Sequence, residues 1–189
     1  MTSVETERLL LRPLEMGDLD AFAPVWADAV VMRHIGSGSP RDRAGSQELL
    51  ERLVAHWDEH GFGLWAVVPK GEPAPVGWAG LMVPSFLPAV LPLLLDMVEV
   101  GWLLARRWWG KGIATEAGAA AIDWGFGGLG LDRLISIVYT DNTASLRVAE
   151  KLAMTRWAVE THPRSGRELA LFERFADGHA PTTPSVTLP

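Results

Sequence analysis

The chain has 189 residues and a net charge of −6 at pH 7, with a sequence pI of about 5.3. Hydrophobic residues make up 48% of it, which excludes an intrinsically disordered chain, and the acidic balance disfavours a basic nucleic-acid surface. The absence of cysteine excludes disulfides, thiolate metal sites, Fe–S clusters and cysteine nucleophiles. Asn142 is the one asparagine and Tyr139 the one tyrosine, so chemistry that needs either has a single candidate.

Residue patterns in chain order predict strands and helices in the order β-αα-βββ-α-β-α-ββ. Leucine-rich, β-branched or alternating runs predict strands over 8–14, 64–68, 76–83, 97–104, 133–140, 155–161 and 168–175. Helical spacing predicts helices over 16–29, 41–60, 113–126 and 142–152. Asp18 is a plausible cap of the first helix and Gly61 ends the second. Hairpins followed by a strand–helix–strand–helix unit favour a mixed sheet.

We expect a single domain over residues 1–176 and a disordered tail over 177–189, which is rich in Gly, His, Pro, Thr and Ser. The N-terminus lacks the pattern of a signal peptide. Prolines and Asp96 interrupt the most apolar stretch, 81–98. Its uninterrupted apolar runs are therefore far shorter than the ~20 residues that a membrane-spanning helix needs. The sequence therefore predicts a cytoplasmic protein without a membrane segment. Residues 87–96 are expected to be a loop that shapes an acceptor pocket or the surface of a homodimer.

The segment from Arg106 to Thr115 joins a predicted strand to a predicted helix. Gly110 and Gly112 permit close backbone approach, and the N–H groups at a helix N-terminus suit a phosphate. The segment does not match a P-loop, because position 105 is Ala and Gly112 follows Lys111. It does not complete the G-x-G-x-x-G fingerprint either, since Thr115 stands at the third glycine. It does match R-x-x-G-x-G, followed by an Ala-rich helix. A simple strand–helix turn with surface charges is the alternative.

With two further motifs, this loop resembles the GNAT superfamily of acyl-CoA-dependent N-acyltransferases, in particular the Rim-type branch of ribosomal-protein alanine N-acetyltransferases. Residues 6–14 look like the family's first strand. Residues 98–104 and 109–116 look like its fourth strand and pyrophosphate loop, and 141–145 with 150–152 like the helix after strand five. The resemblance implies an α/β (α+β) fold with a mixed, mostly antiparallel sheet of about seven strands and about four helices. It also implies acetyl-CoA as cosubstrate and an amine-bearing acceptor.

The resemblance assigns residues to the donor. Backbone N–H groups of the loop would hold the CoA pyrophosphate, at Arg107, Trp108, Trp109, Gly110, Lys111, Gly112, Ile113 and Ala114. The end of the fourth strand, Trp102, Leu103 and Leu104, would lie beside the pantetheine and the thioester. Asn142 would hydrogen-bond the pantetheine arm.

The chain departs from the family pattern at two positions. Many members have a tyrosine seven residues after the asparagine, as the acid that protonates the leaving thiolate; here that position is Ala149. Rim-type members carry a serine three residues after the asparagine, which here is Ser145, either the acid or a residue that caps the helix. Ala153 stands where a glycine usually forms the following turn, at a cost of roughly 1–2 kcal/mol.

An amine attacks a thioester only when it is neutral, which is easier for an α-amine (pKa ~7.7–8.0) than for a lysine (~10.4). Glu99 is the leading candidate for the base, with a purely structural carboxylate as the alternative, and Asp96 is second. His34 is expected to line the acceptor site, although a core or surface histidine is the simpler interpretation. Direct attack in a ternary complex needs no covalent intermediate.

The segment from His56 to His60 matches H-x-x-E-H, an inverted zinc-protease pattern. Gly61 ends the predicted helix at once and the sequence offers no third ligand, so we predict a solvated helix end and no metal. Two other classes of function stay open at this point. One is a binding module that keeps an acyl-CoA site without catalysis, and the other is a metallohydrolase that uses the histidine pair.

Overall fold

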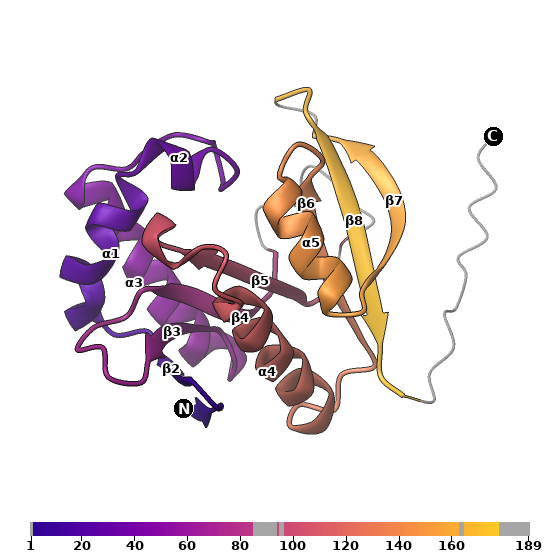
Figure 1. Cartoon of the computed structure of the whole chain (residues 1–189), viewed down its shortest axis with the longest axis horizontal. Helices are drawn as coiled ribbons and strands as arrows, with labels where there is room; N and C mark the ends of the chain where they lie inside the picture. Colours follow the sequence, from indigo (N-terminus) through magenta and orange to yellow (C-terminus); the bar gives the residue numbers. More distant parts are fainter. Residues whose placement is uncertain (1, 85–93, 95–96, 163–164, 178–189) are drawn as a thin grey trace.

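The computed structural model describes residues 2–84, 94, 97–162 and 165–177, which form an eight-stranded sheet with helices on both faces (Figure 1). The strands are β1 (Val4–Glu5), β2 (Leu9–Pro13), β3 (Leu64–Pro69), β4 (Gly77–Met82), β5 (Glu99–Leu104), β6 (Arg133–Tyr139), β7 (Thr155–Thr161) and β8 (Glu168–Phe175). The helices are α1 (Leu19–Trp26), α2 (Ala29–Met32), α3 (Arg43–His60), α4 (Ile113–Gly127) and α5 (Thr143–Lys151), with 3-10 turns η1 (Met16–Asp18) and η3 (Arg106–Trp108).

The predicted mixed sheet is confirmed, and sequence patterns missed its shortest strand and the shortest α-helix. The strand β1 has two residues and α2 has four, too few for a period to be detectable. The expected helix over 16–29 is divided into η1, α1 and the first residue of α2. The predicted site residue Asp96 lies outside the described residues, as does all but the first residue of the predicted tail.

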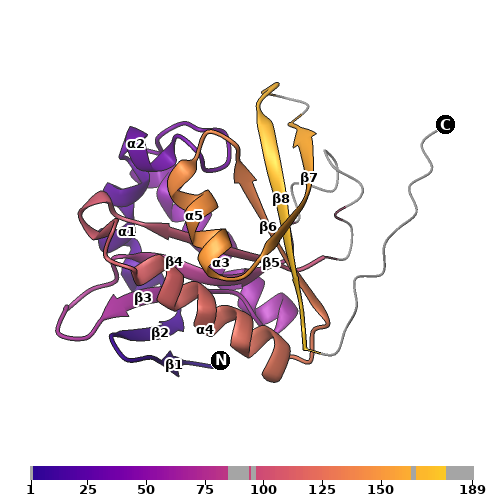
Figure 2. The ribbon, with the colours of Figure 1, turned by 45° about the vertical axis from the view of Figure 1, so that its right-hand side comes forward.

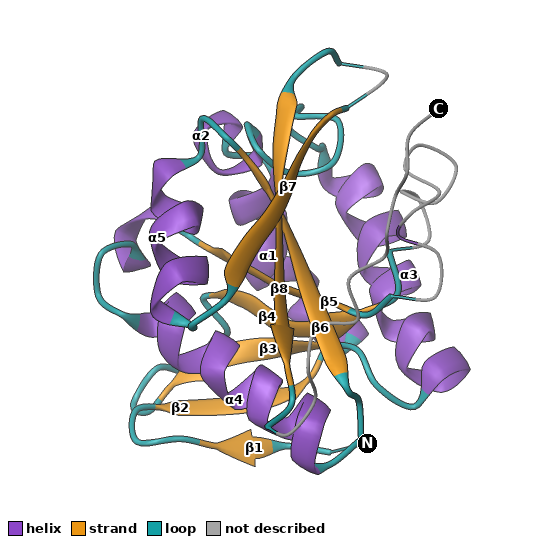
Figure 3. Cartoon of the chain, turned by 90° about the vertical axis from the view of Figure 1, so that its right-hand side faces the viewer, coloured by secondary structure: helices purple, strands orange, loops and turns teal. Residues whose placement is uncertain are grey.

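The sheet has the order β1-β2-β3-β4-β5-β6-β8-β7, and β5 and β6 are its parallel pair. Within the described residues their register joins one pair, Glu99 opposite Ile135, whose N–H donates to the carbonyl oxygen of Val98 at 3.0 Å. By contrast, β6 pairs with β8 along its whole length, from Arg133 to Tyr139. Beyond Glu99, therefore, β5 and β6 diverge, and the sheet separates into a β1–β5 half and a β6–β8 half (Figure 3).

The helices lie on opposite faces of the sheet. In Figure 2, α4 and α5 lie in front of it, and in Figure 3, α3 appears on the other side. Strand β5 serves both cores because its side chains alternate: Leu103 is buried in the core with α1 and α3, whereas Val100 and Leu104 are buried in the core with α4. None of the described helices has the length and apolar character to cross a membrane.

Asp18 is the N-cap residue of α1, as predicted, but its side chain makes no capping hydrogen bond to that helix. Asp18 is buried, and its carboxylate accepts two hydrogen bonds from Arg12, at 2.6 and 2.9 Å, and one from the Glu15 N–H at 3.0 Å. A buried carboxylate needs such a cation, and this pair fastens the end of β2 to the start of the first helix. Gly61 ends α3 as predicted, with a left-handed φ of 73°.

The turn between α5 and β7 forms despite lacking glycine. Ala153 has φ 54° and is the one non-glycine residue with positive φ among those that the structure describes. The N–H groups of Ala153 and Met154 donate to the carbonyl oxygens of Glu150 and Ala149, at 3.0 and 3.1 Å, as in a helix C-terminal turn. The left-handed conformation strains an L-residue that has a Cβ atom, so this turn stores a small conformational cost.

Ala153→Gly is therefore expected to stabilise the protein by roughly 1 kcal/mol, because glycine adopts this conformation without strain. The free energy of unfolding, measured by urea denaturation, checks this. Ala144→Gly, at an exposed position inside α5, is the matched control and should destabilise by about 1 kcal/mol. Equal losses in both variants would show that the turn carries no strain.

Candidate active site

The candidate site lies where β5 and β6 diverge. Because the two strands are parallel, their carboxyl ends lie at the same edge of the sheet. The loop 105–112 follows β5 there and leads into α4, and residues 140–142 follow β6 and lead into α5. The N-termini of both helices therefore lie at this edge, beside the diverging strands (Figure 2).

The loop after β5 has the backbone geometry of an anion site. Gly110 and Gly112 have φ values of 71° and 78°, a region that side chains disfavour. Gly112 is the N-cap of α4, whose first turn offers N–H groups without intrahelical acceptors. A helix N-terminus also carries a partial positive charge, which favours a phosphate. The N–H groups of Trp108 and Trp109 already donate to the carbonyl oxygens of Ala105 and Arg106, at 2.8 and 3.1 Å, so the donors that the loop offers to an anion are those at the start of α4.

Of two tryptophans in the loop, Trp109 ties it to β5 and Trp108 contacts a cation of the loop itself. The Trp109 indole Nε1 donates to the carbonyl oxygen of Leu104 at 2.7 Å, and the Lys111 ammonium lies 4.5 Å from the centre of the Trp108 ring. Arg106 pairs with Asp28 at 2.9 Å and is thereby tied to the start of α2. Arg107 and Lys111 are exposed, so the loop presents cations on an acidic protein.

The end of β5 contributes mainly its backbone. The side chains of Leu103 and Leu104 are buried in opposite cores, so their predicted place beside the pantetheine can only involve main-chain groups. Trp102 is partly buried on the α4 face, and its indole Nε1 donates to the Ser145 hydroxyl oxygen at 3.3 Å. This hydrogen bond connects β5 to α5 across the divergence.

Asn142 and Ser145 lie together in the first turn of α5. The Asn142 side chain caps the helix, because its Oδ1 accepts the Ser145 N–H at 3.2 Å. The residue that caps α5 is thus Asn142, whereas the Ser145 hydroxyl is bonded to Trp102. With Oδ1 engaged, the Asn142 amide retains N–H groups as donors, and the Ser145 oxygen accepts from Trp102 while keeping its own proton to donate.

Glu99 occupies the point at which β5 and β6 separate. Its partly buried carboxyl group is desolvated, which raises its pKa from 4.5 to about 7, although a hydrogen bond from the Ile137 backbone acts in the opposite sense. A carboxyl group with this pKa exists in both protonation states near neutral pH, as a general base requires.

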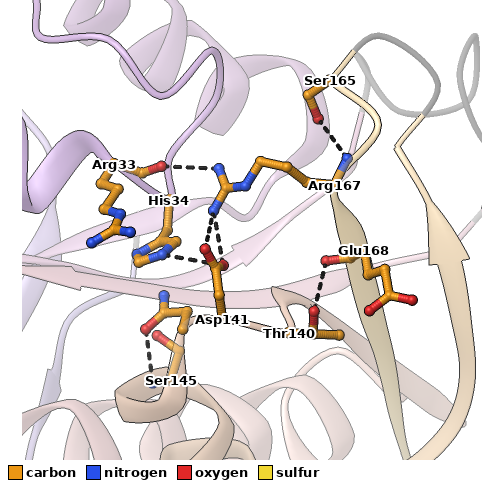
Figure 4. Close-up of polar contacts among 9 residues, drawn as sticks. Arg33, His34, Thr140, Asp141, Ser145, Ser165, Arg167 and Glu168 are labelled. Carbon is orange, nitrogen blue, oxygen red and sulfur yellow. Dashed lines mark hydrogen bonds and ion pairs between the residues drawn. The ribbon is translucent and has the colours of Figure 1, made fainter.

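A polar cluster joins the two halves of the sheet beyond this point (Figure 4). Arg167, at the start of β8, donates to both Asp141 oxygens, at 2.8 and 3.1 Å, and to the carbonyl oxygen of Arg33 at 3.1 Å. The His34 Nε2 lies 3.3 Å from Asp141 Oδ1. The Arg167 guanidinium stacks 3.7 Å from the centre of the Tyr139 ring. The one tyrosine therefore supports this cluster.

The cluster sets the charge states of its members. Desolvation lowers the pKa of His34 by more than the nearby Asp141 raises it, so the imidazole is neutral at pH 7. Desolvation acts to raise the pKa of Asp141, but the hydrogen bond and charge of Arg167 outweigh it and lower the pKa, so this carboxylate stays ionised. His34, which is predicted to line the acceptor site, thus lies close to Asp141, the residue that precedes Asn142 in the chain.

Residues 8–155 match the model of the acetyltransferase (GNAT) domain family. The chain is 26% identical to the N-acetyltransferase p20 of Bacillus licheniformis, over 82% of this chain and 84% of that protein. An acetyltransferase structure from Agrobacterium tumefaciens matches with a TM-score of 0.76 and 29% identity, covering 93% of this chain and 95% of that one. The ribosomal-protein-S5-alanine acetyltransferase of Vibrio fischeri, at 20% identity, has the same fold with a TM-score of 0.71, over 96% and 100% of the two chains.

The chain belongs to the GNAT acetyltransferase family. It is an acetyl-CoA-dependent N-acetyltransferase. Of the predicted site residues of this acetyltransferase, Glu99, Trp102, Asn142, Ser145 and the loop lie along the diverging strands.

Asp141 and Arg167 of the acetyltransferase were not found by sequence analysis. The sequence pointed to Asp141 only as a member of the motif 141–145. Arg167 directly precedes β8, and the pairing of β8 with β6 cannot be deduced from the residue pattern of either strand. Their one signal was position, since Asp141 precedes Asn142 directly.

The histidine pair of the acetyltransferase has a structural explanation. His56 is partly buried, contrary to the expected solvated helix end. Its Nδ1 lies 2.9 Å from the carbonyl oxygen of Phe62, and its Nε2 accepts the Val83 N–H at 3.1 Å. Both ring nitrogens are thus engaged with backbone groups, which connects α3 to the end of β4. The described residues contain no group of three side chains suited to a metal ion.

The stability of the acetyltransferase should depend on pH through Glu99. Its pKa is raised to about 7 by folding, so the folded state holds an extra proton between pH 4.5 and 7. Stability from this group is greatest at acid pH and falls as pH rises through about 7. In urea denaturation, wild type should lose stability relative to Glu99→Gln between pH 5 and pH 8. The exposed Glu72→Gln serves as control, and parallel pH curves for wild type and Glu99→Gln would contradict the assignment.

Proposed function

We propose that this acetyltransferase transfers the acetyl group of acetyl-CoA directly to a primary amine, on a protein N-terminus or a small molecule, within a ternary complex. The observation that carries this proposal is the place and the pKa of Glu99. A carboxyl group with a pKa of about 7 stands where β5 and β6 separate, on the strand that leads to the loop of exposed N–H groups.

The donor would lie along the end of β5 with its pyrophosphate on the loop. Of the predicted N–H groups, those at the start of α4 would bind the pyrophosphate, because those of Trp108 and Trp109 are engaged within the loop. The cations of Arg107 and Lys111 would add to the attraction. The pantetheine would follow the backbone of residues 102–104. Because the capping bond occupies Asn142 Oδ1, Asn142 would donate its amide N–H to a pantetheine carbonyl.

In the reaction a neutral amine attacks the thioester carbonyl carbon. The C–N bond forms, the carbonyl is restored and the C–S bond breaks, so CoA leaves as a thiolate. The ammonium proton passes to the Glu99 carboxylate, directly or through one water. Holding both substrates in one complex supplies much of the rate, because attack becomes effectively unimolecular.

The leaving thiolate needs a proton, for which Ser145 or a water is the source. The position of the family's tyrosine acid is Ala149, which is fully buried in the core. The Ser145 hydroxyl accepts a hydrogen bond from Trp102 and retains its own proton, which supports Ser145 as the donor.

The acceptor would approach from the side of the Asp141–Arg167 cluster. His34 is neutral there and can hydrogen-bond the incoming amine without repelling a cation. The acidic balance of the chain favours cationic acceptors in general. A thiol-release assay with acetyl-CoA and a panel of N-terminal peptides, lysine peptides and small amines tests this function. Binding of acetyl-CoA without thiol release across the panel would refute it.

Glu99→Gln should lower kcat/KM by about 100-fold or more, since the amide cannot accept the proton. In wild type, log kcat/KM, corrected for the neutral fraction of the acceptor amine, should rise with pH and level off above about 7, as Glu99 ionises. The same limb should be missing from the residual activity of the variant. Persistence of the limb in Glu99→Gln would assign the base elsewhere.

Gly112→Trp tests the loop assignment. The indole would crowd the helix N-terminus at a φ of 78°, and acetyl-CoA affinity by calorimetry should fall by about tenfold or more. Gly71→Trp is the matched control, because Gly71 also has positive φ but lies in the exposed β3–β4 turn with open space around it. Equal affinities of wild type and Gly112→Trp would show that the pyrophosphate binds elsewhere.

A further inference from the structure

Arg8, just before β2, is joined to the first turn of α4. Its Nε donates to Glu116 Oε2 at 2.6 Å, and its Nη2 lies 2.6 Å from the same oxygen. The other carboxylate oxygen, Oε1, accepts the Arg8 backbone N–H at 2.9 Å and the Thr6 hydroxyl at 2.5 Å. Four donor groups from one short segment thus surround a single carboxylate. An exposed ion pair has fewer such hydrogen bonds and a less fixed geometry.

Arg8 also contacts the loop itself. Its Nη1 donates to the carbonyl oxygen of Lys111 at 2.9 Å, and a Cβ atom at Gly112 would lie 3.3 Å from its Nη2. In a trans peptide the C=O and the following N–H point in opposite directions. By holding the Lys111 carbonyl oxygen, Arg8 therefore fixes the Gly112 N–H to point away from itself. That N–H is among those predicted to bind the pyrophosphate.

Arg8 also affects the charge at the start of α4, through Glu116. Glu116 lies in the first turn of α4, where the helix N-terminus attracts an anion. Desolvation acts to raise its pKa, but the hydrogen bonds from Thr6 and Arg8 outweigh this and lower it, so the carboxylate is ionised. An ionised carboxylate without a partner would repel the pyrophosphate from the same helix end. Arg8 neutralises it.

We propose that Arg8 is a positioning residue for acetyl-CoA, which aims the Gly112 N–H and neutralises Glu116 at the pyrophosphate loop. The inference rests on the proposed function, because it takes the loop as the place of the pyrophosphate. It makes the segment before β2 part of the donor site, although that segment contributes no group to the chemistry.

The test compares two donors, acetyl-CoA and acetyl-pantetheine, which lacks the pyrophosphate. Arg8→Met should raise KM for acetyl-CoA by about tenfold with little change in kcat, since a charged hydrogen-bonding group is lost. KM for acetyl-pantetheine should not change. Arg8→Lys keeps the charge but cannot bond Glu116 and the Lys111 carbonyl together, so its KM should lie between those of wild type and Arg8→Met.

The double variant Arg8→Met/Glu116→Gln separates charge from geometry. Removing the unpaired carboxylate should recover part of the acetyl-CoA affinity lost in Arg8→Met. Arg43→Met is the matched control, because it breaks the exposed Arg43–Asp20 pair in the same manner and should leave KM for both donors unchanged. Thermal unfolding of each variant checks that it is folded. If Arg8→Met does not fold, the two single variants Arg8→Lys and Glu116→Gln replace it in the test.

The outcomes distinguish this inference from the proposed function. If wild type has the same KM for both donors, the loop does not bind the pyrophosphate and the donor site is wrong. If wild type prefers acetyl-CoA and the Arg8 variants retain that full preference, the donor site stands and the role of Arg8 is overturned. An equal rise in KM for both donors would make Arg8 a structural residue only, and would also overturn it.

Discussion

The separation of β5 from β6 is the constraint on which the rest of the site depends. Two parallel strands that stayed paired would satisfy each other's backbone groups and leave no place for a substrate between them. Here the described register joins Glu99 to Ile135 and no further pair, so the facing backbone groups of the later residues remain available. The N-termini of α4 and α5 lie at the same edge, so an anion site and a polar site come from connectivity alone.

The position of Glu99 follows from the same constraint. Glu99 lies where β5 and β6 are still in register, and its partly buried carboxyl group is desolvated there with no cation paired to it among the residues that the structure describes. The buried pair Arg12–Asp18 is the contrasting case, because a guanidinium accompanies that carboxylate. The buried Asp18 thus connects elements of the fold, and the partly buried Glu99 is left in a state that can exchange a proton.

Much of the fold could be predicted from the sequence because its strands and helices have regular periods, and the motif around Gly112 indicated the loop that we propose for the donor. What could not be predicted depends on contacts between distant segments. Arg167 and Asp141 are 26 positions apart and meet only because β6 pairs with β8. The same holds for Arg8 and Glu116, 108 positions apart. His56 was misjudged because its two backbone partners come from the chain that follows α3, and helical spacing alone gives no information about them.

The two halves of the sheet are fastened to each other in chemically different ways at the two ends of their separation. Where the two halves are still paired, the Ile135 N–H donates to the Val98 carbonyl oxygen, which is a backbone hydrogen bond between neutral groups. At the far end, the Arg167 guanidinium of one half donates to the Arg33 carbonyl oxygen of the other, and the neutral His34 lies 3.3 Å from Asp141. The half-exposed Asp141 pairs with Arg167 within the same half and so orients it toward Arg33. Dissolved salt weakens exposed charge pairs but hardly affects neutral backbone bonds. Salt therefore acts on the Arg167–Asp141 pair that orients the far-end contact, and hardly at all on the backbone bond at the other end.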